Sequence, residues 1–444
     1  MKALMGEQLV RPIRSAGASD RSGVVANDGI RNRGHRTEAL RQVLFGVLLG
    51  MTVNIFLSPS AAAADHIELS RDIFIPSGRT VIMPDALART KEGGYVLAGR
   101  IRGYAPYYGV PWAARIDREG HVQWRYIPDG KGGVVGVEDE GYRSVVTLPD
   151  DSTLLCGAGP VRGGASPLRK GPSILMVGVL THLSKTGKLI GERGFLPTRQ
   201  LQVPYSGFQK CVRWGNGVAV IGDAEAAKKS NGRVVYKNFY WLVVLNAQGQ
   251  VQWTKLIPND IEVPKDVTID QAVVLTNQDL IFEVDYHRIV RVGPHGSVNK
   301  QRISDAVELV HQVVPGTASR LFSGPPAALR TFGRHLKNMG RMTGSAQTIA
   351  TNEAYQLPDG SLVLFGDARP KEDNGHHIAS IEWLSPDLDR KEIFSFPASH
   401  WWGGVTAAVP TGRPGEFVTA RTVVPIPNMP EKRRGVVLSF VHIQ

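Results

Sequence analysis

Two eleven-residue stretches, 129 positions apart, share one pattern: ARIDREGHVQW at 114–124 and VVLNAQGQVQW at 243–253. Val-Gln-Trp ends both stretches, at Trp124 and Trp253. In each stretch an apolar run leads through polar residues and a glycine into a second β-prone run, which is the pattern of a β-hairpin. A chain that repeats a hairpin at this distance is expected to be built from repeated supersecondary units.

Hairpin patterns recur along the rest of the chain. Short β-prone runs joined through Gly, Asn, Asp or Pro occupy 85–99, 142–157, 208–222, 271–284, 353–366 and 406–420. A second hairpin follows each of the first four segments. Two hairpins make a four-stranded antiparallel unit, so the distance between the two repeated stretches corresponds to two units.

The fifth unit decides how many units the chain contains. The gap between the turns near positions 279 and 360 is longer than any other gap between successive turns. Residues 307–324 have the pattern of a further strand–turn–strand unit, which divides the gap into two parts of roughly 40 residues, the size of a minimal blade. Seven units are therefore favoured. Six units with an insertion are the alternative, because Leu329, Phe332, Leu336 and Met339 have the spacing of an amphipathic helix.

Repeated four-stranded antiparallel units of this size predict an all-β fold, a single β-propeller. The last unit ends at residues 435–443, which form its third strand and leave it without a fourth. Residues 66–75 are a spare β-prone run of suitable length. We expect this N-terminal run to complete the last blade and close the ring.

The repeated stretches resemble the blade motif of pyrroloquinoline-quinone-type propellers and of related secreted bacterial repeat proteins. In that family an Asp, a Gly and a Trp of the third and fourth strands dock neighbouring blades. The matching residues are Asp117, Gly120 and Trp124, and then Asn246 in the Asp position, Gly249 and Trp253. The resemblance implies a propeller in which these residues are structural. The sequence lacks an adjacent cysteine pair and a set of calcium ligands, so no cofactor and no metal are expected.

Residues 1–64 have the features of a secretory signal peptide. An apolar run at 43–57 follows several arginines and precedes the small residues Ala61 to Ala64. This run is shorter than the ~20 residues that span a bilayer as a helix. We expect cleavage between Ala64 and Asp65, a periplasmic or secreted domain at 65–444, and no transmembrane span in the mature chain.

The mature chain has two cysteines, Cys156 and Cys211. In an oxidising compartment they can form a disulfide. By lowering the entropy of the unfolded chain, it would stabilise the fold by ~4 kcal/mol. Two separate buried thiols are the alternative, and the sequence does not decide between them.

Positive charge gathers in the loops expected between the second and third strands of each blade. The loops at 100–110, 159–174, 224–239, 368–377 and 422–434 contain 14 Lys/Arg and four Asp/Glu, whereas residues 65–444 together carry a net charge of only +8. The candidate binding residues are Arg162, Arg169, Lys170, Lys228, Lys229, Lys432, Arg433 and Arg434. A one-sided positive field attracts acidic proteins or anionic glycans, and a merely solvated surface is the alternative. Nucleic acid is a poor candidate, because the chain is expected to be exported and these loops lack regular aromatic interleaving.

The loops that enter the innermost strands offer a second candidate site. Carboxylates opposite a histidine suit general acid–base chemistry, and the candidates are Asp85, Asp270, Glu353 and His400. Trp401 and Trp402 follow His400 and suit stacking on a sugar ring or anchoring a protein partner. The alternative is that His400 caps a turn and one of the two indoles belongs to the core.

Two function classes follow. The favoured one is an exported, non-catalytic, monomeric propeller that binds a macromolecule, in first place an acidic protein, as an envelope scaffold or a toxin-neutralising protein. The competing one is a periplasmic enzyme that acts on an anionic small molecule or a sugar at the channel mouth. Periplasmic aryl-sulfate sulfotransferases are propellers with similar short strands and a channel histidine. An enzyme requires His400 and at least two carboxylates to converge on one point.

Overall fold

The computed structural model describes most of the β-rich part of the chain. The chain divides into Met1–Ala64 and Asp65–Gln444, and every described residue belongs to the second unit. The described residues are 66–77, 80–102, 109–128, 141–161, 175–197, 202–230, 233–259, 269, 271–275, 277–284, 288–302, 307–309, 311–312, 321–323, 329–332, 338–342, 349–368, 378–386, 390–396, 404–423 and 434–444. The predicted signal peptide and its cleavage site lie outside them.

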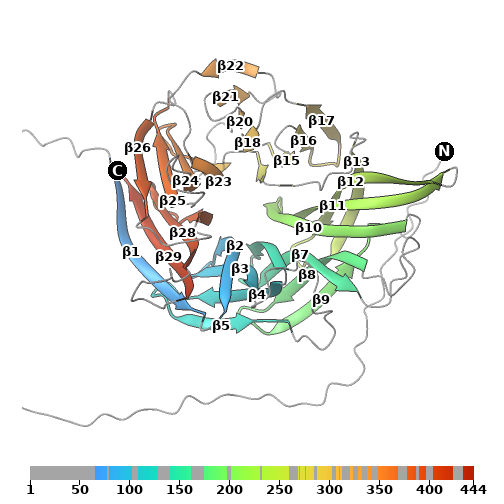
Figure 1. The fold of residues 1–444 in the computed structure, drawn as a ribbon, viewed down its shortest axis with the longest axis horizontal. Helices are drawn as coiled ribbons and strands as arrows, with labels where there is room; N and C mark the ends of the chain where they lie inside the picture. Colours follow the sequence, from blue (N-terminus) through green and yellow to red (C-terminus); the bar gives the residue numbers. More distant parts are fainter. Residues whose placement is uncertain are drawn as a thin grey trace, which may run out of the picture. The chain divides into compact units, whose positions relative to one another are not determined.

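The fold is all-β: the described residues form strands and turns and contain no helix (Figure 1). Its strands associate mainly in antiparallel groups of four, in chain order. The first sheet contains β2 (Val81–Arg89), β3 (Tyr95–Arg102), β4 (Gly109–Ile116) and β5 (Val122–Tyr126). Its tight turns, at 90–94 and 117–121, lie at one end of the strands, and the connection between β3 and β4 lies at the other.

The next two groups repeat this order. They contain β6 (Gly141–Thr147), β7 (Thr153–Val161), β8 (Leu175–Leu183) and β9 (Leu189–Phe195), then β10 (Gln202–Trp214), β11 (Gly217–Ser230), β12 (Arg233–Leu245) and β13 (Val251–Pro258). A parallel pairing of Tyr205 with Met176 joins the two groups into one eight-stranded sheet.

Three further sheets follow. The first contains β14 (Ala272–Val274), β15 (Leu280–Val284), β16 (Arg288–Val292) and β17 (Val298–Arg302). The second contains β18 (Val307–Leu309), β20 (Leu321–Ser323), β21 (Leu329–Phe332) and β22 (Asn338–Met342). The third contains β19 (His311–Gln312), β23 (Ile349–Gln356), β24 (Leu362–Ala368), β25 (Ile378–Leu384) and β26 (Arg390–Ser395). The segment with helical spacing therefore forms the paired strands β21 and β22.

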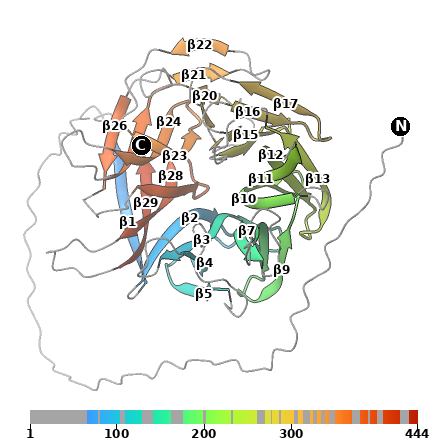
Figure 2. The same ribbon diagram turned by 45° about the vertical axis from the view of Figure 1, so that its right-hand side comes forward.

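The last sheet joins the two ends of the described chain. It contains β27 (Val405–Pro410), β28 (Glu416–Val423), β29 (Gly435–Ile443) and β1 (Ile67–Pro76). β1 pairs antiparallel with β29 from Ile67 opposite Ile443 to Pro76 opposite Gly435, and both views show the two strands side by side (Figures 1 and 2). The predicted pairing of the N-terminal strand with the last unit is thus confirmed.

The hydrophobic core lies between consecutive sheets, and β11 shows how. All four residues from Val218 to Ile221 are fully buried, because both faces of the strand are covered. Val218 and Val220 pack in a cluster with residues of β6–β8, whereas Ala219 and Ile221 pack in a cluster with residues of β15 and β16. The two-residue alternation of a strand thus places one four-stranded group on each side of β11.

Candidate functional site

The two copies of the repeated stretch lie at two comparable contacts between sheets. We call the contact around Arg115, Gln123, Trp124 and Asp151 the first junction, where β4 and β5 meet the turns of the β6–β9 group. We call the contact around Val244, Gln252, Trp253 and Gln278 the second junction, where β12 and β13 meet the turns of the β14–β17 sheet. Alignment of the two stretches makes Val244 the counterpart of Arg115 and Gln252 the counterpart of Gln123.

Arg115 fills the first junction. Its side chain is 1% exposed; its Nη1 donates to the carbonyl oxygen of Asp151 at 3.1 Å and its Nε to Oε1 of Gln123 at 2.9 Å. It also forms an ion pair with the Asp151 carboxylate and contacts Glu92 Oε2 at 3.5 Å. A guanidinium with its donors satisfied in this way is a stable buried charge.

Trp124 packs beside the first junction, against the turn between β8 and β9. Its Nε1 donates to the carbonyl oxygen of Lys185 at 3.0 Å. Its ring lies so close to Gly187 that a Cβ there would be 2.5 Å from Trp124 Cγ. Gly187 also has a φ of +78°, so glycine suits the position for two reasons.

The second junction keeps the same frame but loses the arginine. Gln278 occupies the turn position of Asp151, and both residues have a φ of 65°. The carbonyl oxygen of Gln278 accepts a hydrogen bond of 2.7 Å from Trp214 Nε1, where that of Asp151 accepts one from Arg115. Val244 is too short to reach the space that Arg115 fills in the first junction.

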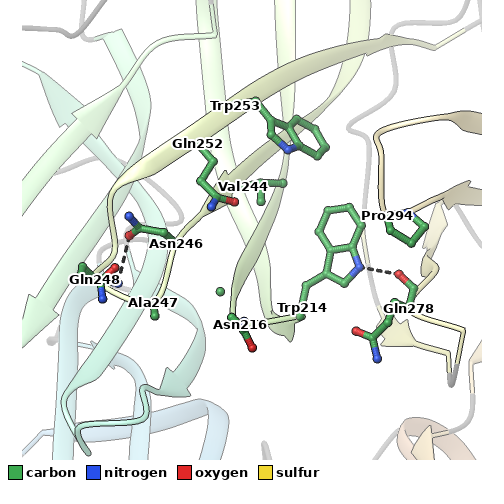
Figure 3. A pocket seen from close by; sticks show the side chains of 12 residues that line it. Trp214, Asn216, Val244, Asn246, Ala247, Gln248, Gln252, Trp253, Gln278 and Pro294 are labelled. Carbon is green, nitrogen blue, oxygen red and sulfur yellow. Dashed lines mark hydrogen bonds between the residues drawn. The ribbon is translucent and has the colours of Figure 1, made fainter.

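A pocket with a volume of about 420 Å³ lies beside Val244 (Figure 3). The two indoles of Trp214 and Trp253 lie on one side of it, with Asn246 and Gln248 on the other. The ring centroids of the indoles are 5.9 Å apart, and the rings are nearly perpendicular. The lining residues are Trp214, Gly215, Asn216, Gly217, Val244, Asn246, Ala247, Gln248, Gln252, Trp253, Gln278 and Pro294.

The turns beside the two junctions are built alike. Asp117 Oδ1 accepts hydrogen bonds from the backbone nitrogens of Gly120 and His121, at 2.8 and 2.7 Å. Asn246 Oδ1 accepts from those of Gln248 and Gln250, at 3.0 and 2.9 Å. Both side chains therefore stabilise a turn, and Asn246 has little capacity left for a ligand.

A basic cluster surrounds Asp85, one of the predicted channel-mouth acids. We call it the Asp85 cluster; it comprises Asp85, Arg100, Arg102, Arg143 and Lys210. Asp85 Oδ2 lies 3.5 Å from Arg100 Nε, and its side chain is 18% exposed. Burial raises the pKa of the Asp85 carboxyl, although the four cations favour its charged form.

The other predicted acid–base residues do not join Asp85 in the described structure. Glu353 lies half-buried on β23, two positions from the buried Tyr355, and is not among the charged neighbours of Asp85. Asp270 and His400 lie outside the described residues, as do the predicted binding residues Trp401 and Trp402.

The structure describes the predicted basic loops only in part. Lys228 and Lys229 lie on β11, where their backbones pair with Val235 and Val234. The carbonyl oxygen of Arg434 accepts a hydrogen bond of 2.9 Å from the backbone of Ser77. The remaining candidates lie outside the described residues: Arg162, Arg169, Lys170, Lys432 and Arg433.

The two cysteines meet in one buried cluster as free thiols. Cys156 on β7 and Cys211 on β10 are both buried and belong to the same hydrophobic cluster. Burial, reinforced by the neighbouring Cys211, raises the pKa of the Cys156 thiol well above its usual range. A raised pKa makes the Cys156 thiol a poor nucleophile.

One cluster contains a serine, a histidine and an aspartate, but it is a turn. Ser152 Oγ donates to Asp150 Oδ1 at 2.6 Å and lies 2.8 Å from His182 Nε2. Ser152 lies between Asp150 and His182, whereas in a catalytic triad the histidine lies between the other two groups. Ser152 is also buried. The same Asp–Ser contact recurs at Asp359 and Ser361. A nucleophile needs access to substrate and a base oriented by a third group, so this cluster is structural.

Among the described residues, no group of three or more His, Cys, Asp or Glu side chains is placed to hold a metal ion. None of the described segments is a helix able to cross a bilayer.

No protein-family model matches the chain, and no curated protein matches it. Among solved structures it is similar to Raptor from Chaetomium thermophilum, with 10% identity and a TM-score of 0.47 over 84% of this chain; the chain spans 29% of the length of Raptor. It is also similar to a DUF4221-family member from Bacteroides vulgatus (10% identity, TM-score 0.40, 86% of this chain and 100% of that one). A third similar structure is a protein of unknown function from Bacteroides caccae, with 12% identity and a TM-score of 0.38. The match covers 68% of this chain and 94% of that one. Similarities this low do not assign a function.

The sequence singled out Asn246 and Trp253 of the pocket, but as structural residues, and it did not indicate the pocket itself. Trp214, Val244 and Gln278 come from three hairpins, and none of them matches a known motif. The available signal was a mismatch: within the repeated stretch, Val244 stands where Arg115 stands in the first copy.

Proposed function

We propose that the mature chain is an exported, non-catalytic β-propeller that binds an acidic macromolecule, in first place a protein, through the loops between the second and third strands of its blades. It would act as an envelope scaffold or as a toxin-neutralising protein. The proposed propeller has seven blades, resembles the pyrroloquinoline-quinone-type repeat proteins and is closed by β1.

The sheet order supports the propeller. Consecutive groups of four strands pack against one another, and β2 of the first sheet contacts β27 and β28 of the last. The segment 307–342 supplies a four-stranded group of its own, which favours seven blades over six with an insertion.

The Asp85 cluster is the observation that carries the binding proposal. Four half-buried basic side chains from three strands lie near one carboxylate and act on its pKa. Arg100 and Arg102 lie at the end of β3 that leads into the first basic loop. Partly buried charges are screened less than fully solvated ones, so such a cluster attracts an acidic partner more strongly than loop lysines alone.

The chemistry around Asp85 favours binding over catalysis. Two-carboxylate chemistry needs a second acid near the first, and the described charged groups that act most strongly on Asp85 are basic. The carboxylate limits the mutual repulsion of the cations and holds them in place.

The test compares partner capture by the mature chain with capture by a variant. The variant is Arg143→Gln/Lys210→Gln, and the matched control is Arg118→Gln/Lys188→Gln, which removes the same charge at the tight-turn end. We expect the mature chain to capture a stoichiometric acidic partner from the cell envelope. The first variant should bind this partner with an affinity lower by about ten-fold or more, and the control should bind it with unchanged affinity.

The salt dependence of binding to the purified partner provides the second readout. It should be less steep for Arg143→Gln/Lys210→Gln than for the unmodified chain. Equal losses in the two variants would contradict the proposal. Turnover of an aryl sulfate that His400→Ala abolishes would establish the competing enzyme instead.

A further inference from the structure

We propose that the pocket of the second junction is a binding site for a neutral sugar in its pyranose form. This site lies at the tight-turn end of the strands, away from the connections between second and third strands, and it does not depend on the function proposed above. The size of the pocket, its lining and its contrast with the first junction all support this proposal.

The pocket has the dimensions of a small-molecule site. Its volume of about 420 Å³ lies within the range of about 300–1,000 Å³ typical of such sites. Its rim is accessible, because the side chains of Gln248, Gln252 and Gln278 are exposed. A monosaccharide can therefore enter without movement of the sheets.

The lining matches the two kinds of surface on a pyranose. The half-buried Trp253, beside the largely buried Trp214, offers apolar ring surface, which suits the C–H face of a sugar. Amide side chains both donate and accept hydrogen bonds, as hydroxyl groups require, and the pocket has them at Asn216, Gln248, Gln252 and Gln278. No charged side chain is among the described residues that line it, which disfavours a strongly ionic ligand.

The first junction explains why the amide of Gln252 is available. Its counterpart Gln123 accepts a hydrogen bond from Arg115. Val244 cannot make that bond, and Gln252 forms no side-chain hydrogen bond to any described residue. An exposed amide at the edge of a pocket, with no partner among the described residues, is available to a ligand.

The indole surface is preorganised. Trp214 is fixed by its hydrogen bond to the Gln278 carbonyl, and it packs edge-on against Trp253. Trp214 is buried on β10 and Trp253 is half-buried on β13, and strands hold side chains more firmly than loops would. Binding therefore requires little ordering of these rings.

The experiment titrates the mature protein with methyl glucoside, methyl galactoside, methyl mannoside and N-acetylglucosamine, each to tens of millimolar. Tryptophan fluorescence and calorimetry are recorded. We expect at least one sugar to bind saturably, with a Kd on the order of 1 mM, as is reasonable for a shallow site. Gln252→Ala should weaken that binding about ten-fold, and Val244→Arg, which fills the pocket, should abolish it.

The control is Val251→Ala, which alters an exposed side chain next to Gln252 that does not line the pocket. It should bind the sugar as the unmodified chain does. Circular dichroism and unfolding midpoints establish that each variant is folded, and Gln252→Ala keeps the test valid if Val244→Arg is not. Binding of none of the four sugars, equal binding by Val244→Arg, or binding of an oligoproline peptide in their place would overturn the proposal.

Discussion

The first and second junctions share one backbone frame and differ in what fills it. In the first, Arg115 reaches the turn residue Asp151 and satisfies Gln123. In the second, Val244 cannot reach the turn, Trp214 makes the hydrogen bond to the turn carbonyl instead, and a pocket lies beside them. The residue at this position, Arg115 or Val244, therefore distinguishes a polar buried contact between two sheets from a contact with an open pocket.

The largest expected effect comes from making the first junction like the second. Arg115→Val leaves the carboxylate of Asp151 buried without its cation, which should lower the free energy of unfolding by about 3–5 kcal/mol. Guanidinium unfolding measures this. Adding Asp151→Gln, which copies Gln278, should restore part of the loss; no recovery in the double variant would show that the two frames are not equivalent.

The glycines beside the two tryptophans should differ in their tolerance of alanine. Gly187→Ala and Gly296→Ala both place a side chain at a φ near +80°, which costs each about 1 kcal/mol. The Gly187 variant adds an overlap with Trp124 worth about 1–3 kcal/mol, whereas the nearest Trp253 atom would be 3.7 Å from the new Cβ at Gly296. Equal losses in thermal or denaturant unfolding would refute the difference in packing.

The indole N–H groups provide a smaller contrast. Trp124→Phe removes the hydrogen bond to the Lys185 carbonyl and should cost about 1 kcal/mol beyond the loss of ring area. Trp253 makes no N–H bond within the described residues, so Trp253→Phe should cost only the ring area. Unfolding free energies of the two variants, measured side by side, give the comparison; a larger loss for Trp253→Phe would reverse it.

The smallest effect concerns pH. Burial alone would raise the pKa of the Asp117 carboxyl, but hydrogen bonds from His121 and Gly120 outweigh it and hold that pKa below its usual range. The charged form therefore stabilises the fold above the usual aspartate pKa, and this contribution is lost as the pH falls through the lowered pKa.

Asn246 carries no charge, so its turn has no such dependence. Asp117→Asn should flatten the decline of stability between neutral pH and about pH 3, and Asn246→Asp should steepen it. The measurement is the unfolding midpoint as a function of pH. Parallel curves for all three proteins would contradict this reading of the turns.

Much of the fold could be predicted from local pattern. Two-residue alternation and turn residues indicated the hairpins, and the unmatched strand at 435–443 indicated a partner, which is β1. The segment around Leu329 was ambiguous because a short apolar spacing fits both a helix and a strand, and the structure forms β21 there.

The candidate sites were harder to predict because their residues come from separate sheets. The cations around Asp85 lie on β3, β6 and β10, and no local pattern links Arg143 to Lys210. The pocket was missed for a related reason: motif reasoning follows the positions that match, such as Trp124 and Trp253, whereas the pocket results from a position that does not.

The most direct measurement is the unfolding free energy of the variant Val244→Arg/Gln278→Asp, which transplants the buried pair of the first junction into the second. If the pocket is the space that Arg115 fills elsewhere, the pair should fit, and the stability should stay within about 1 kcal/mol of the unmodified chain or rise. A loss of about 3 kcal/mol or more, as expected for an overpacked core or a buried charge without its partner, would contradict the account.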